Sequence, residues 1–265
     1  MNSDDALQCS GVAVRYGVHH VLRDVSLSIQ AGECVALVGR NGAGKSTFLR
    51  VLAGAQTPDT GLVKWSGVDA SAVTPREAAQ RVSWLSQSTE GAEAFTALQV
   101  VSFGLFASQS PWASLGESDW QRCREALQAL GVGALADRRV GELSGGERQR
   151  VRFAMAMAQR TPVALFDEPT SAQDLDGSRL MLGALHARAR SGDAVVVAVH
   201  DLSLALQAFG RVVVLHEASV AFDGPPREVV ESGILSSVFG NSVHTSVDSD
   251  GRLWAGVQLD GLDQS

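Results

Sequence analysis

The fold of this chain is decided by the stretch Cys34-Val35-Ala36-Leu37-Val38-Gly39-Arg40-Asn41-Gly42-Ala43-Gly44-Lys45-Ser46-Thr47. A short apolar run, typical of a buried strand, leads into a loop with three glycines, and a helical pattern follows over residues 46–53. Glycines suit such a loop because its backbone N–H groups must turn inward and approach phosphate oxygens closely. A strand, loop and helix in this order predict a site for the phosphates of a nucleotide.

The end of this loop supplies a charge and a metal ligand. We expect Lys45 to place its ammonium group near the β- and γ-phosphates and Ser46 to offer its hydroxyl oxygen to Mg²⁺. The helix that begins here adds its positive N-terminal end. The sequence therefore predicts a bound nucleotide and Mg²⁺ as cofactors. The predicted phosphate-binding residues are Gly39, Arg40, Asn41, Gly42, Ala43, Gly44, Lys45, Ser46 and Thr47.

A pair of acids follows a second apolar run, residues 163–166. The run is short and continuous, as expected for a parallel strand that is buried on both faces. It ends in Asp167 and Glu168, and ligands of open α/β sheets bind at the carboxyl ends of the strands. We therefore expect Asp167 to hold Mg²⁺, directly or through water, and Glu168 to act as the general base on the attacking water.

A second glycine-rich turn, Leu143-Ser144-Gly145-Gly146-Glu147, precedes a helix that is expected to run to residue 159. A serine and two glycines at the start of a helix form an anion-binding end. One nucleotide does not need two such ends from the same chain. We therefore expect Ser144, Gly145 and Gly146 to contact the γ-phosphate of a nucleotide that a second copy of the chain holds.

The composition argues against several classes of protein. The 265 residues are 45% hydrophobic and 19% charged, which are globular values, and the net charge of −7 argues against a non-specific nucleic-acid binder. Cys9, Cys34 and Cys123 show no metal-ligand spacing and are expected to be reduced thiols. The acidic start does not resemble a signal peptide, and no apolar run approaches the roughly 20 residues of a membrane span.

The remaining pattern indicates an α/β fold. Strands are expected within residues 6–38, at 62–65 and 82–86, and buried strands at 194–199 and 212–215, with a helix over 175–190. Residues 88–142 are predicted to be helical with loops. One of these helices is expected to start in a capping box at Ser118 and to stop at Gly131. Pro225-Pro226 predicts a loop, and the tail predicts a hairpin.

With these motifs in this order, the chain resembles the ATP-binding subunit of an ABC transporter over nearly its whole length. The resemblance implies a P-loop NTPase with a RecA-like parallel sheet core, an N-terminal antiparallel β subdomain and an inserted α-helical subdomain at about 88–155. It also implies an ATPase domain over 1–240 and a short β-hairpin extension over 241–265.

The resemblance also implies roles for individual residues. Tyr16, the single tyrosine, would stack on adenine, Gln87 would bind Mg²⁺ and sense the membrane partner, and His200 would be the switch histidine of catalysis. Residues 171–174 match the segment known as the D-loop, in which Asp174 would contact the second subunit. Gln173 stands where the family usually has leucine, so altered packing is expected there.

Within this family the chain resembles importer subunits. Residues 101–104, 200–206 and 224–230 and the tail are similar to the ATPases of iron-siderophore, haem and cobalamin importers, with zinc or manganese importers as the alternative. DNA-repair and chromosome ATPases insert a long coiled coil between the two glycine-rich motifs, whereas here Lys45 and Ser144 are 144 − 45 = 99 positions apart. Translation factors carry two cassettes, and P-loop kinases lack the motif at 143–147.

The expected partners follow from the same resemblance. They are a second copy of the chain in an ATP-dependent dimer, integral membrane permease subunits and, indirectly, a solute-binding protein, but no nucleic acid. The expected location is peripheral, on the cytoplasmic face of the plasma membrane. Gln87 and the segment after it are expected to dock on the permease, with apolar surface from Phe95, Leu98, Val101, Phe103 and Phe106.

Overall fold

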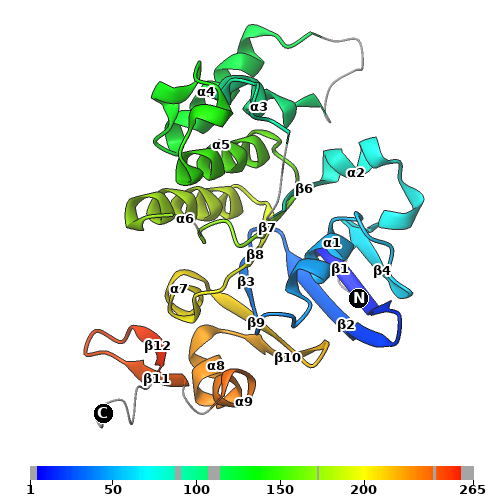
Figure 1. Cartoon of the computed structure of the whole chain (residues 1–265). Coiled ribbons are helices and arrows are strands. Elements are labelled where there is room, and N and C mark those ends of the chain that lie inside the picture. The colour runs from blue at the N-terminus through cyan, green and yellow to red at the C-terminus, as the bar shows by residue number, and fades with distance from the viewer. Residues whose placement is uncertain (1–4, 87–90, 107–113, 172, 241–242, 258–265) are drawn as a thin grey trace.

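A six-stranded sheet forms the centre of the molecule (Figure 1). The computed structural model describes residues 5–86, 91–106, 114–171, 173–240 and 243–257. The strand order is β10-β9-β3-β8-β7-β6, and all neighbours are parallel except β10 and β9. The predicted α/β class with a parallel core is confirmed. The strands are β3 (Cys34–Val38), β6 (Val82–Leu85), β7 (Val163–Asp167), β8 (Ala194–Ala198), β9 (Arg211–His216) and β10 (Ser219–Gly224).

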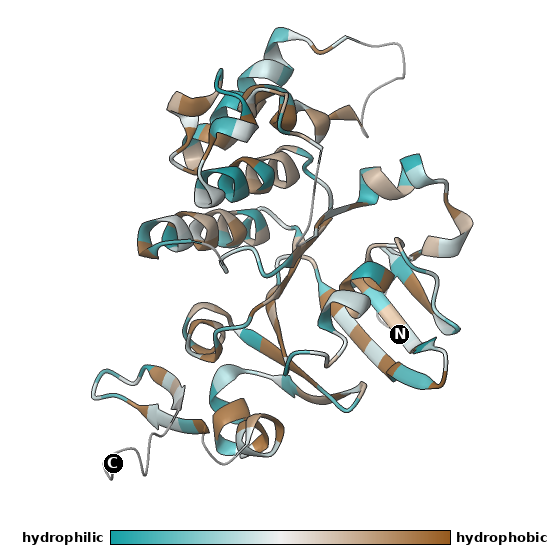
Figure 2. Ribbon diagram, viewed as in Figure 1, coloured by the Kyte–Doolittle hydropathy of each residue, from teal (hydrophilic) through white to brown (hydrophobic). Residues whose placement is uncertain are grey.

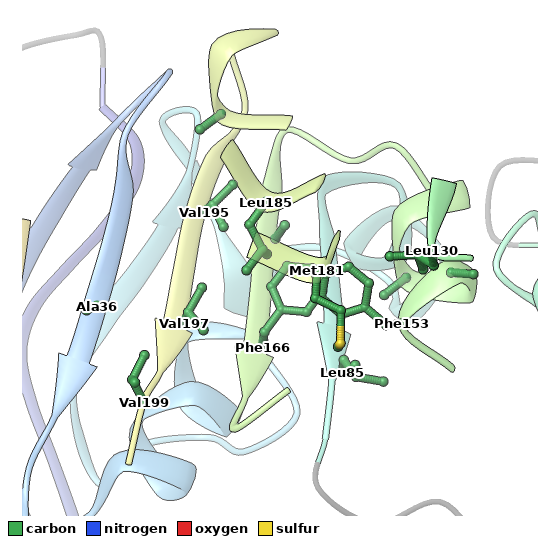
Figure 3. Close-up of a cluster of buried hydrophobic side chains, with 14 of the residues drawn as sticks. Ala36, Leu85, Leu130, Phe153, Phe166, Met181, Leu185, Val195, Val197 and Val199 are labelled. Atoms are coloured by element: carbon green, nitrogen blue, oxygen red, sulfur yellow. The ribbon is translucent and has the colours of Figure 1, made fainter. Parts of the chain in front are cut away.

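Both faces of this sheet are covered, and this explains why its central strands are apolar throughout. Every residue of β7 and β8 is buried. Val195 and Val197 of β8 face one hydrophobic cluster, whereas Val196 faces the other. Figure 3 shows the first cluster, in which Phe166 of β7 packs on Phe153 with ring centroids 4.9 Å apart. Burial on two faces removes the alternation of polar and apolar residues that a half-exposed strand shows.

An antiparallel sheet of order β2-β1-β4-β5 lies beside the core, as predicted for the N-terminal part (Figure 1). The helix α1 (Lys45–Leu52) joins the two sheets, because its buried Phe48 belongs to one cluster with side chains of both. Trp65 of the antiparallel sheet donates its indole N–H to the carbonyl oxygen of Leu52 at 2.9 Å. The phosphate loop is thus held between two sheets. The strands are β1 (Asp5–Tyr16), β2 (His19–Gln30), β4 (Thr60–Trp65) and β5 (Val68–Asp69).

Four helices stack on one side of the sheet, with α6 nearest the strands and α3 and α4 farthest from them (Figure 1). They are α3 (Ala97–Phe103), α4 (Glu117–Ala129), α5 (Gly145–Ala158) and α6 (Leu175–Arg190). The predicted capping box at Ser118 is wrong. Gly116 is the N-cap of α4, and its N–H donates to the carboxylate of Asp119 at 3.1 Å. The predicted stop at Gly131 is confirmed by the end of α4 at Ala129 and by the φ of +68° at Gly131.

A buried arginine fixes α6 against the end of α5. Arg188 donates to the carbonyl oxygens of Ala156 at 3.0 Å and Thr161 at 2.7 Å. It also forms an ion pair with Asp193 at 2.8 Å. Burial lowers the pKa of Arg188 while its contact with Asp193 opposes that shift. These bonds hold α5, which carries the second glycine-rich turn, in a fixed position relative to β7.

The C-terminal part folds back on the helix that follows β8. Ser203 of that helix donates its hydroxyl to the carbonyl oxygen of Ala255 at 2.6 Å and accepts from the N–H of Ala255 at 3.0 Å. A hairpin is present where the tail predicted one, and the division into an ATPase domain and an extension stays a prediction. The elements are α7 (Leu202–Ala208), α8 (Pro226–Glu231), α9 (Ile234–Phe239), β11 (Val243–Val247) and β12 (Leu253–Val257).

Short connecting helices complete the described part of the chain. They are α2 (Pro75–Arg81) and the 3-10 helices η1 (Ala70–Ala72), η3 (Gly133–Leu135) and η4 (Val140–Glu142). Figure 2 shows that the most apolar ribbon lies in the strands of the central sheet. Across the described residues, no helix combines the length and the apolar content that crossing a membrane requires.

Candidate functional site

The phosphate loop connects the carboxyl end of β3 to the first turn of α1. At Gly39 a Cβ atom would lie 2.5 Å from the carbonyl oxygen of Leu215, so the backbone passes too close to β9 for a side chain. Gly44 is the N-cap of α1 with φ +99°, and a Cβ there would lie 2.7 Å from the carbonyl oxygen of Val21. Among the described residues no side chain caps α1. Its first backbone N–H groups are therefore available to an anion.

Lys45 is buried at the base of the loop. Its ammonium group donates to the carbonyl oxygens of Gly39 at 2.8 Å and Arg40 at 3.4 Å. Burial lowers the pKa of Lys45, and the negative charges of Glu168 and Asp167 oppose that shift. A phosphate bound in the loop would favour the charged form of Lys45 in the same way, because an opposite charge nearby stabilises it.

The strand β7 delivers two acids to the same edge of the sheet. Asp167 ends the strand and is buried, and no described residue hydrogen-bonds its Oδ1 atom. Glu168 follows with φ +50°, a left-handed backbone conformation that is rare outside glycine and common at functional sites. The Glu168 N–H donates to the carbonyl oxygen of Ala198 at 3.1 Å, which anchors this turn to the end of β8.

A cavity of about 440 Å³ at this edge brings residues 41–47 of the phosphate loop together with Glu168 and His200. Because β3, β8 and β7 are neighbours, their carboxyl ends lie side by side. His200 follows β8, and the next residue, Asp201, caps α7 by accepting from the N–H of Leu204 at 3.1 Å. The cavity is lined by Val21, Asn41, Gly42, Ala43, Gly44, Lys45, Ser46, Thr47, Glu168 and His200.

The remaining predicted residues do not line this cavity, and one of them lies outside the described part. Tyr16 does not line this cavity; it is 49% exposed, and its hydroxyl donates to Gln56 Oε1 at 2.9 Å. Gln87 lies outside the described residues, and its role stays a prediction. Arg40 lines a second cavity of about 480 Å³, which also includes Gly39, Asn41 and His200 and reaches the C-terminal hairpin.

The turn at residues 143–147 forms the N-terminal end of α5. Ser144 is the N-cap: its Oγ accepts from the N–H of Glu147 at 3.3 Å, and the carboxylate of Glu147 accepts from the N–H of Ser144 at 2.8 Å. Ser144 and Gly145 are exposed. Within the described structure, the cavity at the phosphate loop takes no lining residue from this turn. The contact of this turn with a nucleotide held by a second copy therefore stays a prediction. The exposed N-terminal end of α5, which can bind an anion, supports it.

The segment after Glu168 contacts the first turns of α5, the helix that this turn begins, and sequence reasoning missed these contacts. Gln149 donates to the carbonyl oxygen of Pro169 at 3.3 Å, and Arg150 lies 3.8 Å from Asp174. Asp174 also caps α6 by accepting from the N–H of Gly177 at 2.7 Å. The available signal was spacing, because positions 149 and 150 lie one helical turn after position 146 and share its face. Ala172 lies outside the described residues.

The residues present fit a magnesium–nucleotide complex. The loop offers backbone N–H groups and a buried ammonium group to phosphate, as described above. The buried Oδ1 of Asp167 is a carboxylate oxygen that a cation would satisfy, and carboxylate and hydroxyl oxygens are the ligands that Mg²⁺ prefers. Ser46, which lines the cavity, supplies such a hydroxyl.

Comparisons with known proteins agree with this geometry. The family model described as "ABC transporter" matches residues 22–171. The chain is 43% identical over 239 residues to the hemin import ATP-binding protein HmuV of Rhodococcus jostii, with 89% of this chain and 80% of that protein covered. It is 37% identical over 243 residues to the cobalamin import ATP-binding protein BtuD of Halobacterium salinarum, with 91% of this chain and 61% of that protein covered.

Solved structures share the fold. The dimeric structure of a bacterial ABC transporter cassette matches with a TM-score of 0.76 and 27% identity, over 83% of this chain and 99% of that one. A nucleotide-free ATP-binding cassette from an ABC transporter matches with a TM-score of 0.78 and 22% identity, over 89% of this chain and 97% of that one. At that identity the second match bears on the fold alone, and it confirms the predicted P-loop NTPase architecture.

Proposed function

Because the chain belongs to the ABC transporter family, we propose that this ATPase energises the import of haem through a membrane permease. The observation that carries the proposal is the identity of 41–43% to hemin import ATP-binding proteins of Rhodococcus jostii and Thermobifida fusca over at least 86% of this chain. Cobalamin is the second candidate, because a cobalamin import protein matches at 37%. Iron siderophores are the third candidate, because the sequence resembles the ATPases of iron-siderophore importers.

We propose the following roles in hydrolysis. The phosphate loop and Lys45 bind the β- and γ-phosphates, and Tyr16 stacks on adenine. Glu168 accepts the proton of the attacking water while His200 contacts the γ-phosphate. When bound, Mg²⁺ neutralises charge on the phosphates, held by Ser46, Asp167 and Gln87. The second copy completes the site with Ser144, Gly145, Gly146 and Asp174.

The proposed partners are two permease subunits and a solute-binding protein that delivers the haem. The ATPase would sit peripherally on the cytoplasmic face of the membrane. The ATPase acts on the permease only by closing its own dimer. The closed dimer shifts the permease between two states because it binds one of those states more tightly than the other. Specificity for the solute therefore belongs to the permease and the binding protein.

The test is reconstitution of the chain with its co-purified permease in lipid vesicles. We expect haem-loaded binding protein to raise the ATPase rate several-fold, and the Glu168→Gln complex to show no such rise. Stimulation by cobalamin or a ferric siderophore alone would move the assignment to that solute. A response only to free zinc or manganese would overturn the chelate assignment, and failure to bind any membrane protein would overturn the transport role.

A groove between α3 and α5 is the proposed docking site for the permease. It has a volume of about 570 Å³, and its lining includes Val100, Phe103, Met155 and Arg152. Arg152 also donates to the carbonyl oxygen of Ser86, the last described residue before Gln87, at 3.0 Å. A permease segment in the groove would therefore contact a side chain that is bonded to the strand leading to the nucleotide site.

Exposed aromatic rings extend this groove. Phe95, Phe103 and Phe106 are 41%, 37% and 55% exposed, and Phe103 contacts both other rings, with centroids 5.1 Å and 6.1 Å apart. Of the other residues proposed for this surface, Val101 is fully buried and Leu98 is partly buried against the core, so neither presents the apolar surface that the rings do. An exposed aromatic cluster beside a groove is typical of a protein interface.

Crosslinking tests this surface. A Phe106→Cys variant is expected to crosslink to the permease in the assembled transporter, whereas a Val18→Cys variant, 88% exposed on the β1–β2 turn, is not. The native thiols give little background, because burial raises the pKa of Cys9 and Cys34 to about 12 and of Cys123 to about 11. Equal crosslinking from both engineered positions, or crosslinks to soluble proteins only, would overturn the docking site.

A further inference from the structure

Gln173 joins two segments that the proposed mechanism assigns to different nucleotides. Its Nε2 atom donates to the carbonyl oxygen of Gly146 at 3.1 Å, and its Oε1 atom accepts from Arg150 Nη1 at 3.2 Å. Gly146 and Arg150 lie in the first turns of α5, behind the exposed N-cap Ser144. Gln173 itself lies five residues after Glu168. A single amide side chain thus ties the segment after the general base to the turn that serves the second copy.

The peptide group between Gly146 and Glu147 is held at both ends. Its carbonyl oxygen accepts from Gln173 at 3.1 Å, and its N–H donates to Ser144 Oγ at 3.3 Å. The orientation of this peptide therefore bears on where the Ser144 hydroxyl lies. A leucine at position 173 could fill similar space, but it could make neither hydrogen bond.

Gly177 leaves the space that the side-chain amide of Gln173 occupies. A Cβ atom on Gly177, in the first turn of α6, would lie 2.6 Å from Gln173 Oε1, 2.7 Å from Arg150 Nη1 and 2.9 Å from Asp174 Oδ1. Arg150 is largely buried, with 18% of its side chain exposed, so it cannot move freely into solvent. The position of Gln173 is thus set by contacts from α5 and α6 together.

We propose that Gln173 is a positioning residue that makes the segment after Glu168 and the turn at 143–147 move as one unit, and so couples the two ATP sites of the dimer. The inference rests on the proposed function, in which Glu168 acts on the chain's own nucleotide and Ser144 on the partner's. A change at one γ-phosphate would reach the other site through this amide. Coupling of this kind appears as cooperativity in ATP concentration.

The test uses Gln173→Leu and Gly177→Ala in the full chain. Both are expected to lower kcat about tenfold and to bring the Hill coefficient for ATP toward one, because each breaks the same hydrogen bonds. ATP binding to the separate subunits should not change. Alanine is the better helix former, so Gly177→Ala is not expected to destabilise α6 through the backbone. The double variant should have the same kcat and Hill coefficient as either single variant, since both substitutions break the same hydrogen bonds of Gln173.

A matched control and a second background separate the possible failures. Gln159→Leu removes a glutamine-to-carbonyl hydrogen bond of 2.7 Å at the far end of α5 and should leave kcat and cooperativity unchanged. In the Glu168→Gln background, adding Gln173→Leu should raise the ATP concentration needed to trap the dimer. If Glu168→Gln alone traps no dimer, the proposed dimeric mechanism fails and this inference with it. If it traps one and Gln173→Leu changes nothing, the inference alone is wrong.

Discussion

Replacing Glu168 by glutamine is expected to lower the ATPase rate by about 10²- to 10⁴-fold while ATP binds as well as in the wild type. A general base acts on water only in the transition state, so its loss lowers kcat and leaves ground-state binding intact. ATP binding instead depends on the phosphate loop and on Lys45. Size-exclusion chromatography with ATP should show a dimer of the variant, because the closed state can no longer hydrolyse its ligand.

The control for this prediction is Lys45→Ala. Lys45 is buried, donates to the carbonyl oxygen of Gly39 and feels the negative charges of Glu168 and Asp167, and its removal should abolish ATP binding and not only turnover. Nucleotide binding is measured by titration and turnover by phosphate release. Near-normal turnover in Glu168→Gln, or equal loss of ATP affinity in both variants, would remove Glu168 from the role of general base.

The parts of the site that lie on the central sheet could be predicted from sequence because their positions follow from one rule. Apolar runs before Gly39, Asp167 and His200 mark parallel strands, and parallel strands end at the same edge of a sheet. The structure places β3, β8 and β7 side by side, and the cavity joins their ends. Local pattern was sufficient here because each strand is buried on both faces and is apolar up to its carboxyl end.

Helix starts were harder to predict because neighbouring residues compete for the same role. Ser118 has the side chain of an N-cap, but α4 starts at Glu117 because the Asp119 carboxylate reaches the N–H of Gly116. Pro225-Pro226 predicted a loop, yet Pro226 is the first residue of α8, a position where proline's missing N–H costs nothing.

Side-chain contacts between the helices were not predicted from the sequence. The bond from Gln173 to Gly146 spans 27 residues, and it forms because α5 and α6 pack side by side. The role of Tyr16 stays a prediction. Resemblance implies that it stacks on adenine, whereas its hydroxyl is bonded to Gln56 and its ring lies outside the lining of the cavity. The adenine role therefore rests on resemblance alone.

The second large effect is expected at Ser144, in the turn that would complete the partner's site. Ser144→Arg places a long charged side chain at the exposed N-cap of α5, where the partner's γ-phosphate is expected. We expect hydrolysis to fall by about 10²-fold or more, as on loss of a phosphate-stabilising donor, while ATP still binds at the variant's own loop. Ser144→Asp is the matched variant: aspartate keeps the N-cap of α5, so α5 stays intact while a negative charge repels the phosphate.

Mixing two inactive variants tests whether each ATP site is built from two chains or from one. In a mixed dimer, Ser144→Arg supplies an intact phosphate loop and Lys45→Ala supplies an intact turn at 143–147, so one of the two sites is complete. We therefore expect two inactive preparations to regain activity when mixed, as measured by phosphate release. The chain that carries both substitutions should not regain activity with either single variant, because no complete site can form. Activity proportional to the first power of protein concentration, with no recovery on mixing, would mean that each chain hydrolyses ATP alone and that Ser144 faces no partner nucleotide.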